Sequence, residues 1–202
     1  MKKLLSLALC LIMLLSVALM SCDNTDNQTN ETSAESTSAL TTSEDTTSES
    51  TSKETTAPAI PDGYQAYNDG YIYFVYPGTW SKNSGSVVTL GKANESNNIT
   101  VVYEDKTDYY EKMTTAIFKS EMKPVYESMG MTLSGEKVEQ TTNNSGTKIT
   151  KVSYTAIVNG VSMQQTAYAL TVGNRTYTVT VTEVTPDTEL VNNVFNSLAK
   201  LK

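Results

Sequence analysis

The sequence predicts an α+β domain, an antiparallel β-sheet flanked by two helices, preceded by a long polar segment. Runs rich in β-branched and aromatic residues follow one another with short turns between them, which favours antiparallel pairing. Two amphipathic helical patterns occur, one at 108–129 between the strand runs and one near the C-terminus. All aromatic residues lie after position 57, so the folded core is expected there.

Residues 1–21 have the layout of a secretory signal. Lys2 and Lys3 precede an almost wholly apolar run, 4–20, and Ser21 supplies a small residue at its end. The run is slightly shorter than the roughly 20 residues that a membrane span requires. An uncleaved anchor would still hold the lysines inside and send the rest of the chain outside. Both interpretations predict export.

The tetrapeptide LMSC at the end of this run resembles a bacterial lipobox. Leu19, Ser21 and Cys22 match the pattern, and Met20 is an acceptable but uncommon residue at the remaining position. The resemblance implies transfer of a diacylglycerol, with acyl chains such as palmitate, to the Cys22 thiol and cleavage before it. Two acyl chains anchor a protein stably, whereas one binds marginally. The alternative is an ordinary signal with an incidental cysteine; Cys10 does not match the pattern.

The composition of residues 22–57 predicts a disordered stalk. The tract holds eight acidic residues, one lysine (Lys53) and a single large apolar residue (Leu40). Such a composition cannot bury enough apolar surface to offset chain entropy. Self-repulsion extends the tract, with a reach on the order of 30 Å or more. We expect a tether that holds a domain away from the membrane; a spacer with no further role is the alternative.

Residues 58–202 predict one folded domain. It has 14 acidic and 12 basic residues, and Arg175 is its one arginine, so the acidity of the chain is that of its stalk. A nucleic-acid partner is not expected, because such proteins normally carry a basic stripe. The chain has no histidine, and it has no cysteine after Cys22. Histidine-based triads, disulfides and zinc sites of Cys and His are excluded in the domain.

The first predicted strands come before the first helix. The run YIYFVYP, 71–77, is aromatic and β-branched, and Pro77-Gly78 ends it. Because both alternating sets of positions are apolar, we expect a central strand covered on both sides. Two further strands are predicted at 86–90 and 98–104.

The helix predicted at 108–129 places its apolar side chains on one stripe. Asp108 and Glu111 have the spacing of a capping box at its start. Pro124 should kink it, and Gly130 should end it.

Four more strands and a second helix complete the domain. Asn159-Gly160 marks a two-residue hairpin turn between two of these strands. Thr185 is the expected cap of the last helix, with Pro186 in its first turn and an apolar face on Leu190, Val194 and Leu198. The predicted strands are 136–142, 147–158, 161–172 and 176–184.

The motif F-x-Y-P-x-x-W, formed by Phe74, Tyr76, Pro77 and Trp80, gives a family resemblance. This motif, together with the order of predicted elements over 63–201, makes the chain similar to the PsbP/Mog1-type (DcrB/LpqN-type) domain. The resemblance implies an α/β/α sandwich. Members include photosystem accessory proteins, a nuclear-transport cofactor and bacterial lipoproteins, so fold does not fix activity. Histidine ligands proposed in some members cannot be carried over to a chain without histidine.

Tyr64 and Tyr67, ahead of the first predicted strand, are the candidates for an exposed ligand-binding surface, because aromatic platforms bind sugars and peptides. A cluster of carboxylates is either a calcium site or a helix cap with solvated neighbours, and the missing glycine-turned loop favours the cap. Its members are Glu104, Asp105, Asp108 and Glu111. We predict no catalytic residue, metal or cofactor.

The sequence is interpreted as a lipoprotein anchored outside the bacterial membrane through Cys22. Its domain is expected to be a non-enzymatic binding or assembly module for another extracytoplasmic protein. A module for cell-wall glycan or a small ligand, and an unrecognised hydrolase, are the alternatives. A protein partner predicts an exposed apolar patch, a glycan predicts a groove lined by rings, and an enzyme predicts convergent carboxylates with shifted pKa values.

Overall fold

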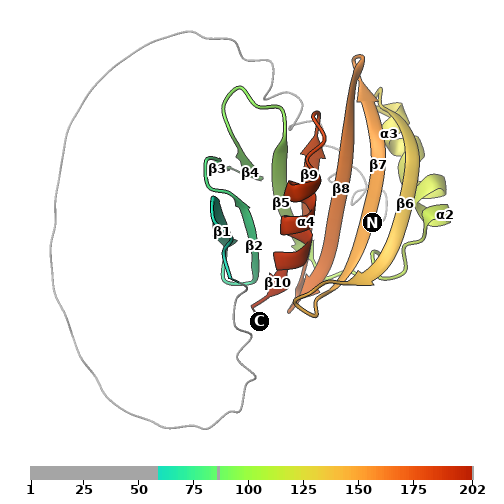
Figure 1. Ribbon diagram of the computed structural model, residues 1–202. Coiled ribbons are helices and arrows are strands. Elements are labelled where there is room, and N and C mark those ends of the chain that lie inside the picture. The colour runs from blue at the N-terminus through green and yellow to red at the C-terminus, as the bar shows by residue number, and fades with distance from the viewer. Residues whose placement is uncertain (1–58, 86, 202) are drawn as a thin grey trace, which may run out of the picture.

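The computed structural model describes residues 59–85 and 87–201, so the predicted signal, Cys22 and the stalk lie outside the described residues. Within this part the strands form two antiparallel sheets accompanied by helices, which confirms the α+β class (Figure 1). The larger sheet has seven strands in the order β3-β4-β5-β9-β8-β7-β6. The smaller sheet has the order β1-β2-β10.

The four longest strands, β6 to β9, lie close to the predicted ranges, and Asn159 and Gly160 have the positive φ angles, 51° and 81°, of the predicted hairpin turn. The strands are β1 Tyr64–Asn68, β2 Ile72–Pro77, β3 Ser81–Ser84, β4 Val88–Gly91, β5 Asn98–Asp105, β6 Thr132–Thr142, β7 Lys148–Val158, β8 Val161–Val172, β9 Arg175–Glu183 and β10 Ala199–Lys200. The helical segments are α2 Thr115–Ile117, the π-helix η1 Phe118–Met122, α3 Lys123–Ser128 and α4 Thr188–Ser197.

Helical segments pack on both faces of the larger sheet (Figure 1). On one face, Leu190 and Val194 of α4 share a core with Tyr168 of β8. On the other face, Phe118 of η1 packs against Tyr154 of β7, with ring centroids 5.5 Å apart. Side chains alternate along each strand, so the sheet separates two apolar clusters.

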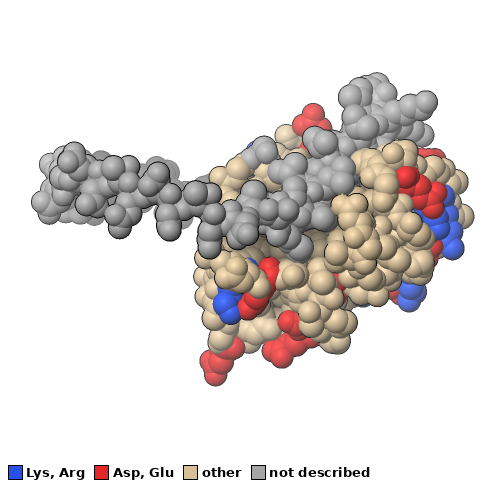
Figure 2. Space-filling view, turned by 90° about the horizontal axis from the view of Figure 1, so that it is seen from above, with Lys and Arg blue, Asp and Glu red and all other residues tan. Residues whose placement is uncertain are grey.

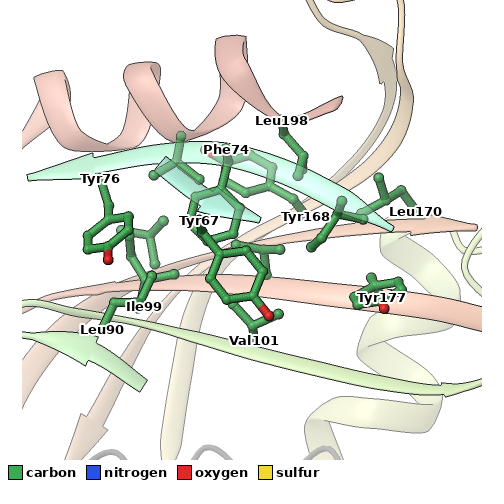
Figure 3. Packing of buried hydrophobic residues seen from close by; sticks show 14 of the residues in the cluster. Tyr67, Phe74, Tyr76, Leu90, Ile99, Val101, Tyr168, Leu170, Tyr177 and Leu198 are labelled. Atoms are coloured by element: carbon green, nitrogen blue, oxygen red, sulfur yellow. The ribbon is translucent and has the colours of Figure 1, made fainter. Parts of the chain in front are cut away.

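Strand β2 is buried on both sides, as its sequence predicts. Ile72, Phe74 and Tyr76 belong to the core shared with the larger sheet, and the rings of Phe74 and Tyr76 point from β2 toward that sheet (Figure 3). Tyr73 and Val75, on the opposite side, belong to a separate small cluster.

The helix predicted at 108–129 begins later than expected. Its N-cap is Thr114, whose hydroxyl accepts a hydrogen bond from the N–H of Ile117 at 3.2 Å. The capping box expected at Asp108 and Glu111 is therefore wrong. The carboxylate of Asp108 instead pairs with Lys112 in the turn before the helix.

A π-helical turn precedes Pro124 inside this segment. The N–H of Lys123 bonds to the carbonyl of Phe118, five residues earlier, so one extra residue is accommodated there. Proline removes a donor and crowds the preceding turn, so a break in the α-helical ladder near Pro124 is expected. Gly130, at φ 83°, follows the end of α3 as predicted.

The last helix is capped by Asp187 and not by Thr185. The Asp187 carboxylate accepts the N–H of Leu190 at 2.9 Å. The N–H of Thr185 donates instead to the side chain of Asn97 at 3.1 Å, which holds this residue in the connection before the helix.

The sequence does not predict three short strands. In β3 all residues are polar and exposed, so no apolar alternation marks it. In β10 only two residues pair with β2, and the N–H of Leu201 then bonds to the carbonyl of Tyr71 at 2.8 Å. Strand β1 pairs with β2 through the turn that carries Asp69 and Gly70.

Candidate functional site

The two tyrosines predicted to form a ligand surface have different environments. Tyr64 is partly exposed at the start of β1, and its hydroxyl donates to the carboxylate of Glu189 in the first turn of α4 at 3.2 Å. Partial burial raises the pKa of the Tyr64 hydroxyl. Tyr64 thus links β1 to α4, with part of its ring still facing solvent.

Tyr67 is only 5% exposed, so the expectation that it lies on the surface is wrong. Its ring stacks on Phe74 with centroids 4.9 Å apart, and these residues are cross-strand partners (Figure 3). The Nζ of Lys82 lies 5.2 Å from the centroid of the same ring. The sequence does hold a signal for this packing, because Asp69-Gly70 is a hairpin turn that pairs Tyr67 with the next strand.

A cluster that the sequence does not predict forms around Arg175, the one arginine of the chain. Its guanidinium carbon lies 4.2 Å from the ring centroid of Tyr71 and 4.3 Å from that of Tyr103. Arg175 also donates to the hydroxyl of Tyr177 at 3.3 Å. We call Asp69, Tyr71, Tyr103, Arg175 and Tyr177 the arginine cluster.

Strand register brings three members of the cluster to one face. Tyr103 of β5 is the cross-strand partner of Tyr177 of β9. Arg175 lies two residues before Tyr177 and therefore on the same face of the sheet. The ring centroids of Tyr103 and Tyr177 are 5.4 Å apart.

A turn supplies the rest of the cluster. The carboxylate of Asp69 accepts the N–H groups of Tyr71 and Ile72 at 2.9 and 3.0 Å, which fixes the entry into β2. Its second oxygen accepts the hydroxyl of Tyr177 at 2.8 Å. The same carboxylate thus shapes the turn that carries Tyr71 and ties that turn to β9.

The arginine cluster has a buried floor and an exposed top. Tyr177 is 0% exposed, whereas Tyr103 is 57% exposed. Burial raises the pKa of the Tyr177 hydroxyl to about 12, with the neighbouring Asp69 adding to the rise against an opposing effect of Arg175. The hydroxyl stays protonated at neutral pH and donates to Asp69 while it accepts from Arg175.

The carboxylates considered for a calcium site have different environments. Asp108 pairs with Lys112, and Glu104 is partly buried in β5. Burial, and secondarily the charge of Asp105, raises the pKa of Glu104 to about 7. Within 59–85 and 87–201, no group of three or more Asp, Glu, His or Cys side chains is arranged to hold a metal ion.

Charges are dispersed on the face of the domain seen in Figure 2. Lysine and arginine side chains lie there in small groups beside acidic ones, and most of the visible surface is uncharged. Among the helices of the described residues, none combines the length and apolar character needed to cross a bilayer.

Comparison with known proteins gives partial structural similarities. No protein-family model matches the sequence, and no curated protein matches it. A crystal structure from Bacteroides thetaiotaomicron aligns with a TM-score of 0.47 and 10% identity, covering 69% of this chain and 49% of its own. The chain thus spans about half the length of that protein. LpqN, which is involved in cell envelope biogenesis of Mycobacterium tuberculosis, aligns with a TM-score of 0.38 and 12% identity, covering 68% of this chain and 90% of its own. This chain is similar to both only in part, and its function is inferred from its own residues.

Proposed function

We propose that the protein is a lipoprotein held outside a bacterial membrane through Cys22, and that its domain binds another extracytoplasmic protein through the arginine cluster. The observation that carries the proposal is the position of Arg175 between Tyr71 and Tyr103, with Tyr103 exposed. The signal and lipobox patterns support the location.

Tyrosine and arginine are the residue types that contribute most to protein interfaces. Here both rings and the guanidinium are already fixed by stacking and by the buried hydroxyl of Tyr177. A partner would therefore order few additional rotamers, which lowers the entropic cost of association.

The guanidinium keeps donors for a partner. It has five N–H donors, and among the described residues its hydrogen-bond acceptor is the hydroxyl of Tyr177. The unused N–H groups suit carboxylate or carbonyl oxygens of a protein loop. The expected partner segment is thus an acidic or carbonyl-rich loop that covers Tyr103.

The glycan alternative fits this cluster less well. Sugars stack on the faces of aromatic rings, and Arg175 already occupies one face each of Tyr71 and Tyr103. Tyr67, the other ring predicted for a glycan surface, is buried. An exposed ring beside a cationic group is better suited to a protein surface.

The hydrolase alternative requires carboxylates of raised pKa that converge in one place. Burial raises the pKa of Glu104 and of Glu183. Glu104 pairs across from the start of β9, at Thr176, whereas Glu183 is the last residue of that strand. The two groups therefore lie at opposite ends of β9 and do not form a catalytic pair.

The test is capture of the partner from intact cells. Tagged protein is crosslinked with formaldehyde, purified, and compared with Arg175→Ala and with Lys92→Ala, which removes a positive charge that pairs with Glu95. We expect a protein retained by wild type and by Lys92→Ala and lost with Arg175→Ala. If wall polysaccharide is recovered with the tagged protein and is released by digestion of the cell wall, the glycan alternative is supported. Recovery of the same protein in equal amount with all three tagged proteins would refute the proposal.

A further inference from the structure

A groove of about 760 Å³ lies at the end of the larger sheet that is opposite to the β7–β8 hairpin (lower end in Figure 1). The ends of β6, β7, β8 and β9 form its floor, and the turn with Tyr110 and Glu111 forms one wall. Lys200 of β10 and Lys148 at the start of β7 line it as well.

The wall of this groove is fixed by internal hydrogen bonds. The side-chain amide of Gln140 and the hydroxyl of Thr150 both donate to the carbonyl of Tyr110, at 3.0 and 2.9 Å. The hydroxyl of Thr150 also lies 2.8 Å from the amide oxygen of Gln140. These polar groups hold the turn against the strands, so the groove exists before any ligand is bound.

The charged groups of the groove are mainly lysines. Lys148 and Lys200 line it, Lys106 lies close enough to act on Lys200, and Glu111 is the one acidic lining residue. Within the described part of the chain, none of these three lysines forms an ion pair. Burial, and then the charges of Lys148 and Lys106, lower the pKa of Lys200, whereas Glu111 opposes this effect.

We propose that this groove binds a phosphate group of a small polar ligand between the ammonium groups of Lys148 and Lys200, while Glu111 accepts a hydroxyl or ammonium donor of the same ligand. Lysine binds phosphate as a point charge. Three lysines and one carboxylate leave an excess positive charge that a phosphate monoester, with a charge of about −1.5 to −2 at neutral pH, balances. A single carboxylate ligand would leave part of that charge uncompensated.

This site is separate from the arginine cluster. Thr176 lines the groove beside Arg175 of the cluster, but the side chains of these two neighbours leave β9 on opposite faces. No member of the arginine cluster lines the groove, so the two surfaces use different side chains. The inference about phosphate goes beyond the proposed function and does not depend on it.

The test is a calorimetric titration of the full chain, purified in detergent, with inorganic phosphate and with glycerol 3-phosphate. The variants are Lys148→Met combined with Lys200→Met, and Lys92→Met as the control. Lys92 follows β4, whose last residue pairs with the start of β5, so it lies at the opposite end of the sheet. We expect the double variant to weaken binding of glycerol 3-phosphate at least tenfold and the control to leave it within twofold.

Further variants and a lipid ligand distinguish the role of charge, a folding defect and a lipid headgroup. Combined Lys148→Arg and Lys200→Arg retains both charges and should retain most of the affinity, and Lys148→Met alone replaces the double variant if the latter does not fold. Short-chain phosphatidic acid, whose headgroup is a phosphate monoester, is added in the same titration; binding tighter than that of glycerol 3-phosphate would identify a lipid headgroup as the ligand. Weak binding of phosphate that is the same in all variants would mean an adventitious ion only and would overturn the proposal.

Discussion

The hydroxyl of Tyr177 donates to the carboxylate of Asp69 at 2.8 Å, and the two residues are 108 positions apart in the chain. This bond ties the turn before β2 to the start of β9 and places Tyr71 on one side of Arg175. The smaller sheet and the larger sheet therefore build the arginine cluster together, and neither can form it alone.

Removing the Tyr177 hydroxyl, which joins the turn before β2 to β9, should lower the stability of the fold. Tyr177→Phe leaves one carboxylate oxygen of Asp69 and a guanidinium N–H without their partner, so we expect a loss of about 1 kcal/mol in the free energy of unfolding. Urea denaturation measures this loss. Tyr103→Phe, whose hydroxyl belongs to an exposed ring, is the matched control and should change stability by less than about 0.5 kcal/mol. Equal losses in both variants would contradict the role given to Tyr177.

The partly buried carboxylate of Glu104 should make stability depend on pH. Burial raises its folded-state pKa to about 7 from 4.5, so the folded state binds a proton more tightly than the unfolded state. Stability should therefore fall as pH rises from about 4.5 to about 7 and change little above that range. Since Glu104 is partly exposed, the discounted effect is about 1–2 kcal/mol.

Glu104→Gln should remove this part of the pH dependence and stabilise the protein at pH 8, as measured by urea denaturation across the pH range. The exposed Asp62, which precedes β1, provides the control Asp62→Asn, which should leave the profile unchanged. A Glu104→Gln profile identical to that of wild type would rule out this titration.

The pair formed by Lys123 and Glu136 should be the most stabilising ion pair of the described residues. Its atoms are 2.6 Å apart, the Glu136 side chain is 4% exposed, and Lys123 also donates to the carbonyl of Leu133 at 3.0 Å. Lys123→Ala leaves the carboxylate of Glu136 without its nearest partner, so we expect a measurable loss in the free energy of unfolding, larger than that from removing an exposed pair.

The control for this pair is Lys137→Ala, which removes an exposed pair with Glu139 and should cost less than about 1 kcal/mol. Lys123 lowers the pKa of Glu136, so the stabilisation should be present above pH 4.5 and disappear as pH falls through the folded-state value. Similar melting temperatures for the two variants at pH 7 would be inconsistent with this pairing.

Anchoring through Cys22 can be tested independently of the domain. Cys22→Ala should release the protein from the membrane or leave its precursor unprocessed, because the thiol that would receive the lipid is absent. Fractionation and the electrophoretic mobility of the precursor report the result. Cys10→Ala is the control and should be processed normally. A Cys22→Ala protein that is still processed and membrane-bound would exclude the lipobox interpretation.

Apolar periodicity was sufficient to predict the long strands β6 to β9 and the burial of β2 on both faces. It failed where local hydrogen bonds decide the structure. Asp108 could cap a helix, yet its carboxylate pairs with Lys112, and the helix begins only after Thr114. Short polar strands such as β3 carry no apolar pattern at all.

The arginine cluster could not be predicted for a different reason. Its members come from the turn before β2, from β5 and from β9, and only tertiary register brings them together. The sequence singled out Tyr67 by its position before a strand, but the hairpin places that ring in the core against Phe74. Exposure depends on strand pairing, which a single aromatic-rich run does not specify.

The proposed function requires the exposed edge of the arginine cluster to contact a protein partner. The most direct measurement is photocrosslinking in intact cells from a benzophenone amino acid placed at Tyr103, with the same group at exposed Ile157 on the β7–β8 hairpin side as the reference. We predict one protein adduct from position 103 that is absent from position 157 and lost when Arg175→Ala is added. The same adducts from both positions, unaffected by Arg175→Ala, would contradict binding of a partner at the arginine cluster.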